Sequence, residues 1–155
     1  MISEELCLVN LSNMECKYIN VLSVDDFYNK LNEFNKFDND IEIQYMNGSL
    51  SGESTNNFIK ILKISEEYKI DLEEVGAIYN YFNNIEDTKN TIENSYTIIN
   101  ASNKENAFIE YLEGLDFFNG IPSNIVNYLD YESIMRDYEI EGLNIINYKD
   151  NYIFC

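Results

Sequence analysis

The chain has 155 residues, and its 28 Asp and Glu against 10 Lys and Arg give it a net charge of −18, with no histidine. This charge disfavours binding to nucleic acids and membrane surfaces and favours basic partners. The lack of histidine excludes Ser-His-Asp and Cys-His nucleophile systems, and a hydrophobic content of 45% is too high for a disordered acidic tail.

Three short strands and one helix are predicted in the first third of the chain. The runs 6–11 and 17–24 are typical of strands, and 40–48 alternates apolar with polar side chains. The segment "SVDD", which begins at Ser23, has the spacing of a capping box with Asp in the place of Glu, so it predicts the start of a helix. These elements indicate a small α+β unit.

A linker and three helices are predicted next. The segment 47–57 is rich in Gly, Ser and Asn, which is typical of a linker. Apolar residues then recur at helical spacing over 55–68, after the helix start at Asp71, and more weakly over 86–94. This part of the chain is expected to form a short helical bundle.

The last part of the chain mixes both kinds of element. A strand is predicted over 95–99, a helix after the capping box "SNKE" at 102–105, and a short helix at Pro122, where a missing N–H costs nothing. A further helix begins at Asp130, and 142–154 is predicted to be a hairpin with its turn at Lys149-Asp150-Asn151.

The sequence thus predicts an α+β fold of three small subdomains. The first is an α+β subdomain over 1–52, the second a helical subdomain over 53–94, and the third an α+β subdomain over 95–155.

The three cysteines predict neither a disulfide framework nor a zinc site, because they are scattered and odd in number. We expect a reducing, cytoplasmic environment and no metal or cofactor. The N-terminus is acidic and lacks the apolar run of a signal peptide, and no stretch approaches the ~20 apolar residues of a membrane span.

The only arginine of the chain lies on the helix predicted from Asp130. Glu132 precedes Arg136 by four residues, which is the favourable order for an ion pair on a helix. We therefore predict that Arg136 is a structural brace that pairs with Glu132 and a neighbouring acid. The alternative is an ordinary amphipathic helix with a surface ion pair of little energetic consequence.

The acidic residues are the candidate functional groups. Helical acids one turn apart are separated by about 6 Å along the axis, close to the spacing of successive backbone phosphates. Duplex DNA carries about two charges per base pair, so this net charge corresponds to about nine base pairs. A DNA mimic is therefore physically plausible. The candidate DNA-mimic acids are Glu66, Glu67, Asp71, Glu73, Glu74, Glu86, Asp87, Glu105, Glu110, Glu113, Asp116, Asp130, Glu132, Asp137, Glu139 and Glu141.

Two other functions are also compatible with the acidic residues. An acidic scaffold for a basic protein needs no particular spacing. A glycosidase needs only two carboxylates at a set separation, but chance supplies such pairs in so acidic a chain. We expect a protein that is not an enzyme.

The segment 121–154 resembles the C-terminal signature of the ArdA antirestriction family. The matching positions are Ile121-Pro122, Tyr128-Leu129-Asp130-Tyr131-Glu132, Met135-Arg136-Asp137, Glu139 and Gly142, followed by the terminal hairpin. The middle of the chain is similar to the family in its order of predicted elements but not in its residue identities. The N-terminal third departs from the family, because "LSNMECKYINVLSV" stands where a Gly-x-Trp is usual.

The resemblance implies an elongated α+β protein of three small subdomains, which forms a homodimer and imitates bent B-form DNA. Its target would be the DNA-binding methyltransferase core of a Type I restriction–modification enzyme, and a phage or mobile element would carry it. A mimic aimed at another defence nuclease, such as a CRISPR effector, is the alternative. Phe117, Phe118, Tyr128 and Tyr131 are candidates for a dimer contact, with core packing as the alternative role.

Overall fold

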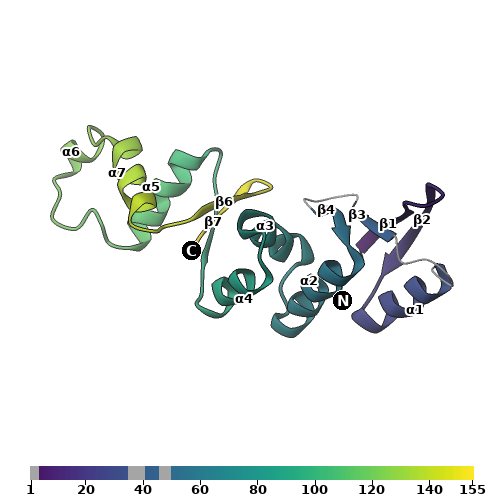
Figure 1. The fold of residues 1–155 in the computed structure, drawn as a ribbon. Coiled ribbons are helices and arrows are strands. Elements are labelled where there is room, and N and C mark those ends of the chain that lie inside the picture. The colour runs from purple at the N-terminus through teal and green to yellow at the C-terminus, as the bar shows by residue number, and fades with distance from the viewer. Residues whose placement is uncertain (1–3, 35–40, 46–49) are drawn as a thin grey trace. The chain divides into compact units, whose positions relative to one another are not determined.

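The computed structural model describes residues 4–34, 41–45 and 50–155. These residues form helices and two antiparallel sheets, so the predicted α+β fold is confirmed (Figure 1). They group into two compact units, Met1–Glu93 and Asn94–Cys155. The further division predicted at 52/53 falls inside the first unit and stays a prediction.

The first unit contains a four-stranded antiparallel sheet in the order β2-β1-β3-β4. Its strands are β1 (Glu4–Asn10), β2 (Glu15–Val21), β3 (Ile41–Tyr45) and β4 (Ser51–Ser54). The first three correspond to predicted strands, of which residue 40 and residues 46–48 lie outside the described residues. Leu6, Leu8 and Ile43 are fully buried and share one face of the sheet, and Cys7 and Val9 on the other face of β1 are buried as well.

Strand β4 corrects the prediction of a linker over 47–57, of which 47–49 lie outside the described residues. "SGES" has no apolar residue that could announce a strand. It pairs with β3, with a register shift between Ile43 and Gln44. Gly52 takes a φ of +80°, a conformation that favours glycine. The strand therefore depends on its partner, and local sequence does not reveal it.

Four helices complete the first unit: α1 (Val24–Phe34), α2 (Thr55–Tyr68), α3 (Leu72–Phe82) and α4 (Ile85–Glu93). Helix α2 begins where the Ser54 hydroxyl accepts the N–H of Asn57, and α3 begins where Asp71 accepts the N–H of Glu73. Both helices end in left-handed residues, Lys69 and Asn83.

The core of the first unit joins the helices to the sheet. The rings of Phe27 on α1 and Phe58 on α2 lie 5.1 Å apart, and both side chains are fully buried. Helix α2 also packs against β3, β4, α3 and α4. Burying large aromatic side chains dominates such cores, so this contact ties α1 to α2.

The second unit contains a three-stranded antiparallel sheet in the order β5-β7-β6, together with three helices (Figure 1). Its elements are β5 (Thr97–Asn100), α5 (Lys104–Gly114), α6 (Ser123–Val126), α7 (Tyr131–Ile140), β6 (Ile145–Tyr148) and β7 (Asn151–Phe154). The predicted terminal hairpin is confirmed, with a two-residue turn at Lys149 and Asp150. Pro122 immediately precedes α6, as predicted.

Helix α5 begins one residue later than the predicted capping box implies. Asn103, not Ser102, is the N-cap, and its side chain accepts the N–H of Asn106 at 2.8 Å. The Ser102 hydroxyl instead accepts a hydrogen bond from the Asn106 amide group. Two adjacent residues can cap equally well, so the choice falls to the backbone geometry of the preceding loop.

The core of the second unit forms where α5 packs on the sheet. Phe108 and Leu112 are fully buried beside Phe154. Tyr111 stacks on Phe154 with ring centroids 4.5 Å apart and planes tilted by only 7°. This packing fixes α5 over β5 and β7, which sets the position of the acidic residues on its outer side.

Within the described segments, no helix is both long and apolar enough to cross a membrane. The same segments hold no group of three or more Cys, Asp or Glu side chains that could bind a metal ion.

Candidate functional site

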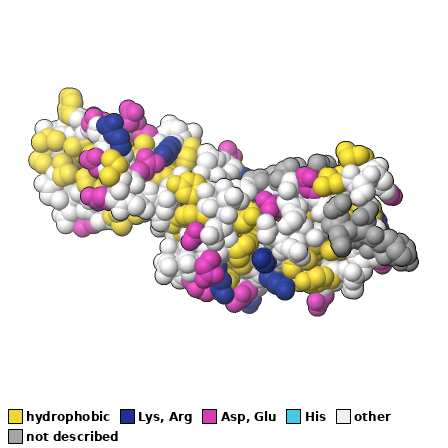
Figure 2. Space-filling view, in the orientation of Figure 1, with side chains coloured by type: hydrophobic (Ala, Val, Ile, Leu, Met, Phe, Trp, Pro, Cys, Tyr) yellow, Lys and Arg dark blue, Asp and Glu magenta, His cyan; other side chains and the backbone are white. Residues whose placement is uncertain are grey.

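Most of the predicted DNA-mimic acids lie on the surface. All of them are exposed except Glu73, which is buried, and Glu74, which is half-buried. On the face drawn in Figure 2, acidic side chains are scattered over both units, with Lys and Arg side chains between them. The acids are therefore accessible to a partner from elements of both units.

Glu73 is a correction to the predicted set of surface acids. Its exposed fraction is 7%, because α3 is buried on nearly all sides between Leu72 and Tyr79. Glu73 lies in the acidic first turn of the helix predicted to start at Asp71. Tertiary packing nevertheless buries its side chain, so Glu73 cannot take part in a surface that imitates phosphates.

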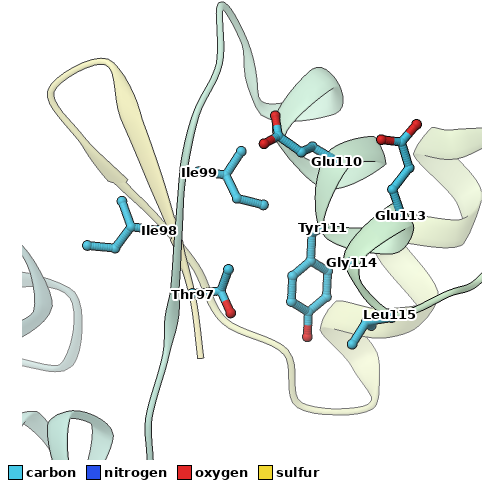
Figure 3. A pocket seen from close by; sticks show the side chains of 8 residues that line it. All are labelled: Thr97, Ile98, Ile99, Glu110, Tyr111, Glu113, Gly114 and Leu115. Carbon is cyan, nitrogen blue, oxygen red and sulfur yellow. The ribbon is translucent and has the colours of Figure 1, made fainter.

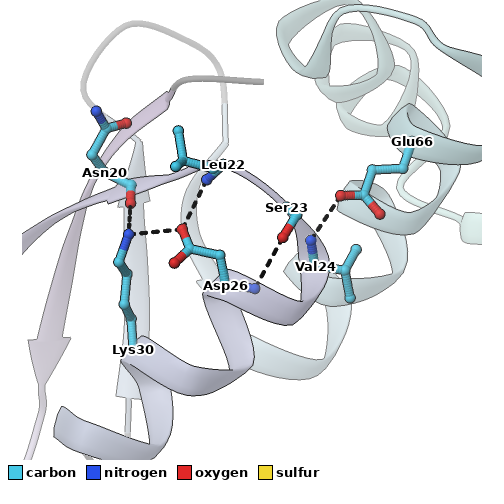
Figure 4. A network of polar contacts seen from close by, with 7 residues as sticks. All are labelled: Asn20, Leu22, Ser23, Val24, Asp26, Lys30 and Glu66. Atoms are coloured by element: carbon cyan, nitrogen blue, oxygen red, sulfur yellow. Dashed lines mark hydrogen bonds and ion pairs between the residues drawn. The ribbon is translucent and has the colours of Figure 1, made fainter. Parts of the chain in front are cut away.

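Several exposed acids are held in place by hydrogen bonds. Glu66 accepts the N–H of Val24 at 2.8 Å, and this bond joins α2 to the first turn of α1 (Figure 4). A carboxylate is stabilised there by the positive end of the helix dipole. Glu139 on α7 pairs with Lys104 of α5 at 2.6 Å. These contacts orient carboxylates that an isolated helix would leave free to rotate.

The capping box at Ser23 forms with a modification. The Ser23 hydroxyl accepts the N–H of Asp26 at 3.0 Å, as predicted, but Asp26 reaches past Ser23 to the N–H of Leu22 at 2.9 Å (Figure 4). Lys30 donates to the same carboxylate at 2.7 Å and also to the carbonyl of Asn20. The Lys30 hydrogen bond, followed by the Leu22 amide, lowers the pKa of Asp26.

Arg136 does not form the predicted ion pair with Glu132. The ion pairs between described residues are Lys30–Asp26, Lys89–Glu93 and Lys104–Glu139. The guanidinium instead donates to the Ser133 hydroxyl at 3.2 Å. Positions three and four residues back are both neighbours on a helix surface. Ser133 lies three residues before Arg136, and its hydroxyl also donates to the carboxylate of the N-cap residue Asp130.

Asp130 is the N-cap of α7, as predicted, and hydrogen bonds connect it through Ser133 to Arg136. It accepts the N–H of Ser133 at 3.0 Å and the Ser133 hydroxyl at 2.7 Å. These two bonds, and then the nearby positive charge of Arg136, lower the pKa of Asp130. Arg136 therefore supports the start of its own helix through Ser133.

Three of the four candidate dimer aromatics pack inside the second unit. Phe117, Phe118 and Tyr131 are half-buried against its core. The Phe118 and Tyr131 rings meet edge to face at 6.2 Å, and the Tyr131 hydroxyl donates to the carbonyl of Val126. Tyr128 differs, with 87% of its surface exposed. Of the four, Tyr128 is the side chain available in full to a partner.

An open pocket of about 490 Å³ lies between β5 and the C-terminal half of α5 (Figure 3). Thr97, Ile99 and Tyr111 face each other across it, and Glu110 and Glu113 project from α5 beside it. The pocket could not be predicted from the sequence, because two separate elements form its walls and the strand "TIIN" has no charged residue that would mark a site.

No family model matches the chain, and no curated protein matches it. The likeness of segment 121–154 to the ArdA signature therefore rests on the residues themselves.

Proposed function

We propose that this protein is an acidic DNA mimic that occupies the DNA-binding groove of a Type I restriction–modification enzyme without catalysis. The observation that supports the proposal is the exposure of nearly all predicted acids on both units. These exposed acids are 14 of the 28 Asp and Glu residues in a chain whose net charge is −18. A basic groove that binds DNA phosphates would attract such a surface.

The anchored carboxylates suit this role because they lose little freedom on binding. Glu66, Asp130 and Glu139 already accept hydrogen bonds from their own chain. Ordering a free side chain at an interface costs about 0.5–1.5 kcal/mol. A preformed array of charges avoids part of that cost, as rigid DNA does.

The proposal includes a homodimer and an antidefence role in the cytoplasm of a bacterial host, both of which the resemblance to the ArdA family implies. Tyr128 is the aromatic residue that we propose as a dimer contact, because its side chain is almost fully exposed. Exposed aromatic residues are enriched at protein interfaces.

The decisive experiment is competition with DNA. A fluorescent duplex bound to a Type I methyltransferase core would be titrated with this protein, and the released DNA measured by anisotropy. We expect displacement of the duplex at low salt. In a direct titration without DNA, we expect binding of this protein to the core to weaken by orders of magnitude between about 50 and about 200 mM salt, as for ligands that neutralise several basic groups. Absence of displacement, or direct binding that is independent of salt, would contradict the proposal.

The same assay separates the alternative targets. DNA released only from a CRISPR effector would favour a mimic of another defence nuclease. Binding to a basic protein without any DNA release would favour an acidic scaffold. Replacing exposed acids by amides in groups should erode displacement gradually, because many weak contacts share the binding energy. Abrupt loss from one replacement would instead indicate a single dominant contact.

A further inference from the structure

Among the described residues, strand β5 pairs with β7 and with no other strand, so its other edge is unpaired within the second unit. Ala101 donates to the carbonyl of Asp150 in line with this pairing. Backbone bonds alternate along an antiparallel strand. Thr97 and Ile99 therefore bond to β7, and the N–H and C=O groups of Ile98 and Asn100 point outward.

The β5 edge lacks the usual protection against strand addition. Natural proteins guard such edges with lysine, proline or a bulge. The strand "TIIN" has none of these, and its pairing with β7 is continuous over all four residues. Ile98 is 40% exposed, and Thr97 and Asn100 are exposed as well. An incoming strand would find accessible backbone partners here.

The pocket adjoins the same strand. Thr97 and Ile99 point toward α5, and Ile98 points to the opposite side of the sheet (Figure 3). A strand added beside β5 would place alternate side chains on the α5 side, next to the pocket. The cavity of about 490 Å³ is large enough for such a side chain.

The charge of the pocket selects the incoming side chain. Glu110 and Glu113 lie one helical turn apart on α5, and both are exposed. The remaining lining residues are uncharged: Thr97, Ile98, Ile99, Tyr111, Gly114 and Leu115. A lysine or arginine could lay its apolar stem along Ile99, Tyr111 and Leu115 and bring its charge to the two carboxylates.

We propose that β5 and this pocket bind an extended segment of a partner protein in which Lys or Arg alternates with apolar residues. The segment adds a strand to the sheet at Ile98 and Asn100 and places its basic side chains beside Glu110 and Glu113. Main-chain hydrogen bonds supply affinity in this mode of recognition, and side-chain pockets supply specificity. The β5 edge of a second copy of this chain is a poorer occupant, because the strand "TIIN" brings no Lys or Arg to Glu110 and Glu113.

This docking does not require the proposed DNA mimicry, because the segment is recognised by its strand conformation and by its alternation of basic and apolar residues. The probe is a short capped peptide of alternating valine and lysine, labelled with a fluorophore and titrated with the full chain. One control peptide has the same composition with its lysines grouped together. A second control has glutamate in place of lysine. We expect binding of the alternating lysine peptide alone.

Two pairs of protein variants locate the site. Ile98→Pro removes an outward-facing N–H that the sheet does not use, so it should abolish peptide binding and leave the fold intact. Asn147→Pro is the matched control on the far edge. Asn144 and Cys155 exchange two backbone bonds, so the alternation places the Asn147 N–H outward on β6. Circular dichroism and thermal unfolding verify that both variants fold.

The second pair tests the charges. Glu110→Gln with Glu113→Gln should weaken peptide binding by about tenfold or more, since charge-assisted contacts are lost. Glu132→Gln with Glu141→Gln removes the same charge from two exposed acids that do not line the pocket, and it should leave binding nearly unchanged.

Three results would overturn the proposal. The first is no preference for the alternating peptide over the grouped one. The second is equal loss of binding in both double variants, which would indicate non-specific attraction to the acidic surface. The third is self-association in analytical ultracentrifugation that Ile98→Pro abolishes and Asn147→Pro does not, because the edge would then belong to a second copy of this chain.

Discussion

At the scale of single residues, the Ser133 hydroxyl connects the only arginine of the chain to a helix N-cap. It accepts from Arg136 and donates to Asp130, whose other carboxylate oxygen accepts the N–H of Ser133. The caps at Ser23, Asp71 and Asp130 could be predicted from sequence, because each bond spans only two or three residues. The hydrogen-bond partner of Arg136 could not be predicted from sequence, because Glu132 and Ser133 are both its neighbours on the helix surface.

Arg136→Ala should weaken the start of α7 without affecting the DNA-mimic surface. The variant loses one hydrogen bond at an exposed site, so we expect a decrease in the free energy of unfolding of less than about 1 kcal/mol. Displacement of DNA from the target should change little. The measurements are urea unfolding and the competition assay, with Arg136→Lys as a control that keeps the charge. A folded variant that no longer displaces DNA would make Arg136 a contact residue.

Asp130→Asn should remove a pH-dependent contribution to stability. The pKa of Asp130 in the folded protein lies below the ordinary 3.8. The ionised group therefore stabilises the fold above that value, and this contribution is lost as pH falls through the lower folded pKa. Asparagine caps helices well, so the variant keeps the cap and loses the titration.

We expect the stability difference between wild type and Asp130→Asn to be constant above about pH 5 and to shrink below about pH 4. Urea unfolding across this range measures it. Ser133→Ala is the companion variant: without the hydroxyl donor, the pKa of Asp130 should move back toward 3.8. A difference that does not vary with pH would contradict the role assigned to these bonds.

At the scale of elements, Gly76 permits the close packing of α3 against the segment before β4. A Cβ atom at Gly76 would lie 2.9 Å from two side-chain carbons of Leu50, which is fully buried. A glycine in the middle of a helix normally lowers its stability. The glycine is explained by its close contact with Leu50 and not by the stability of the helix itself. The helix could be predicted from sequence, but the contact with Leu50 could not.

Gly76→Ala should therefore destabilise the first unit despite the better helix propensity of alanine. Overpacking costs typically 1–3 kcal/mol, against a gain of about 1 kcal/mol from propensity. Gly114→Ala is the matched control: nothing lies within 4 Å of its added Cβ, so it should be neutral or stabilising. Urea unfolding measures both variants. The double variant with Leu50→Ala should lose less than the sum of the single losses.

At the scale of the whole molecule, the two compact units have separate cores. Phe58 lies in the first, and Phe108 lies in the second. Both side chains are fully buried. The boundary of the units at Glu93 and Asn94 lies next to the predicted boundary at 94/95. The inclusion of α2, α3 and α4 in the same unit as the first sheet was not apparent from sequence.

Phe58→Ala and Phe108→Ala should each destabilise mainly their own unit. Deleting a buried phenylalanine side chain costs about 3–5 kcal/mol. Amide hydrogen exchange should show lost protection within Met1–Glu93 for the first variant and within Asn94–Cys155 for the second. Equal loss of protection in both units from either variant would indicate a single cooperative fold instead.

The sequence by itself determined the α+β class, most helices and strands, and an acidic surface. Helix caps and apolar periodicity depend on residues close together in the chain, and net charge depends on composition alone. Tertiary structure alone decided the burial of Glu73, the pairing of β4, the packing of three candidate dimer aromatics, and the pocket beside the β5 edge. Each of these depends on a segment outside the element concerned, because burial and strand pairing are set by the segment that packs against a residue.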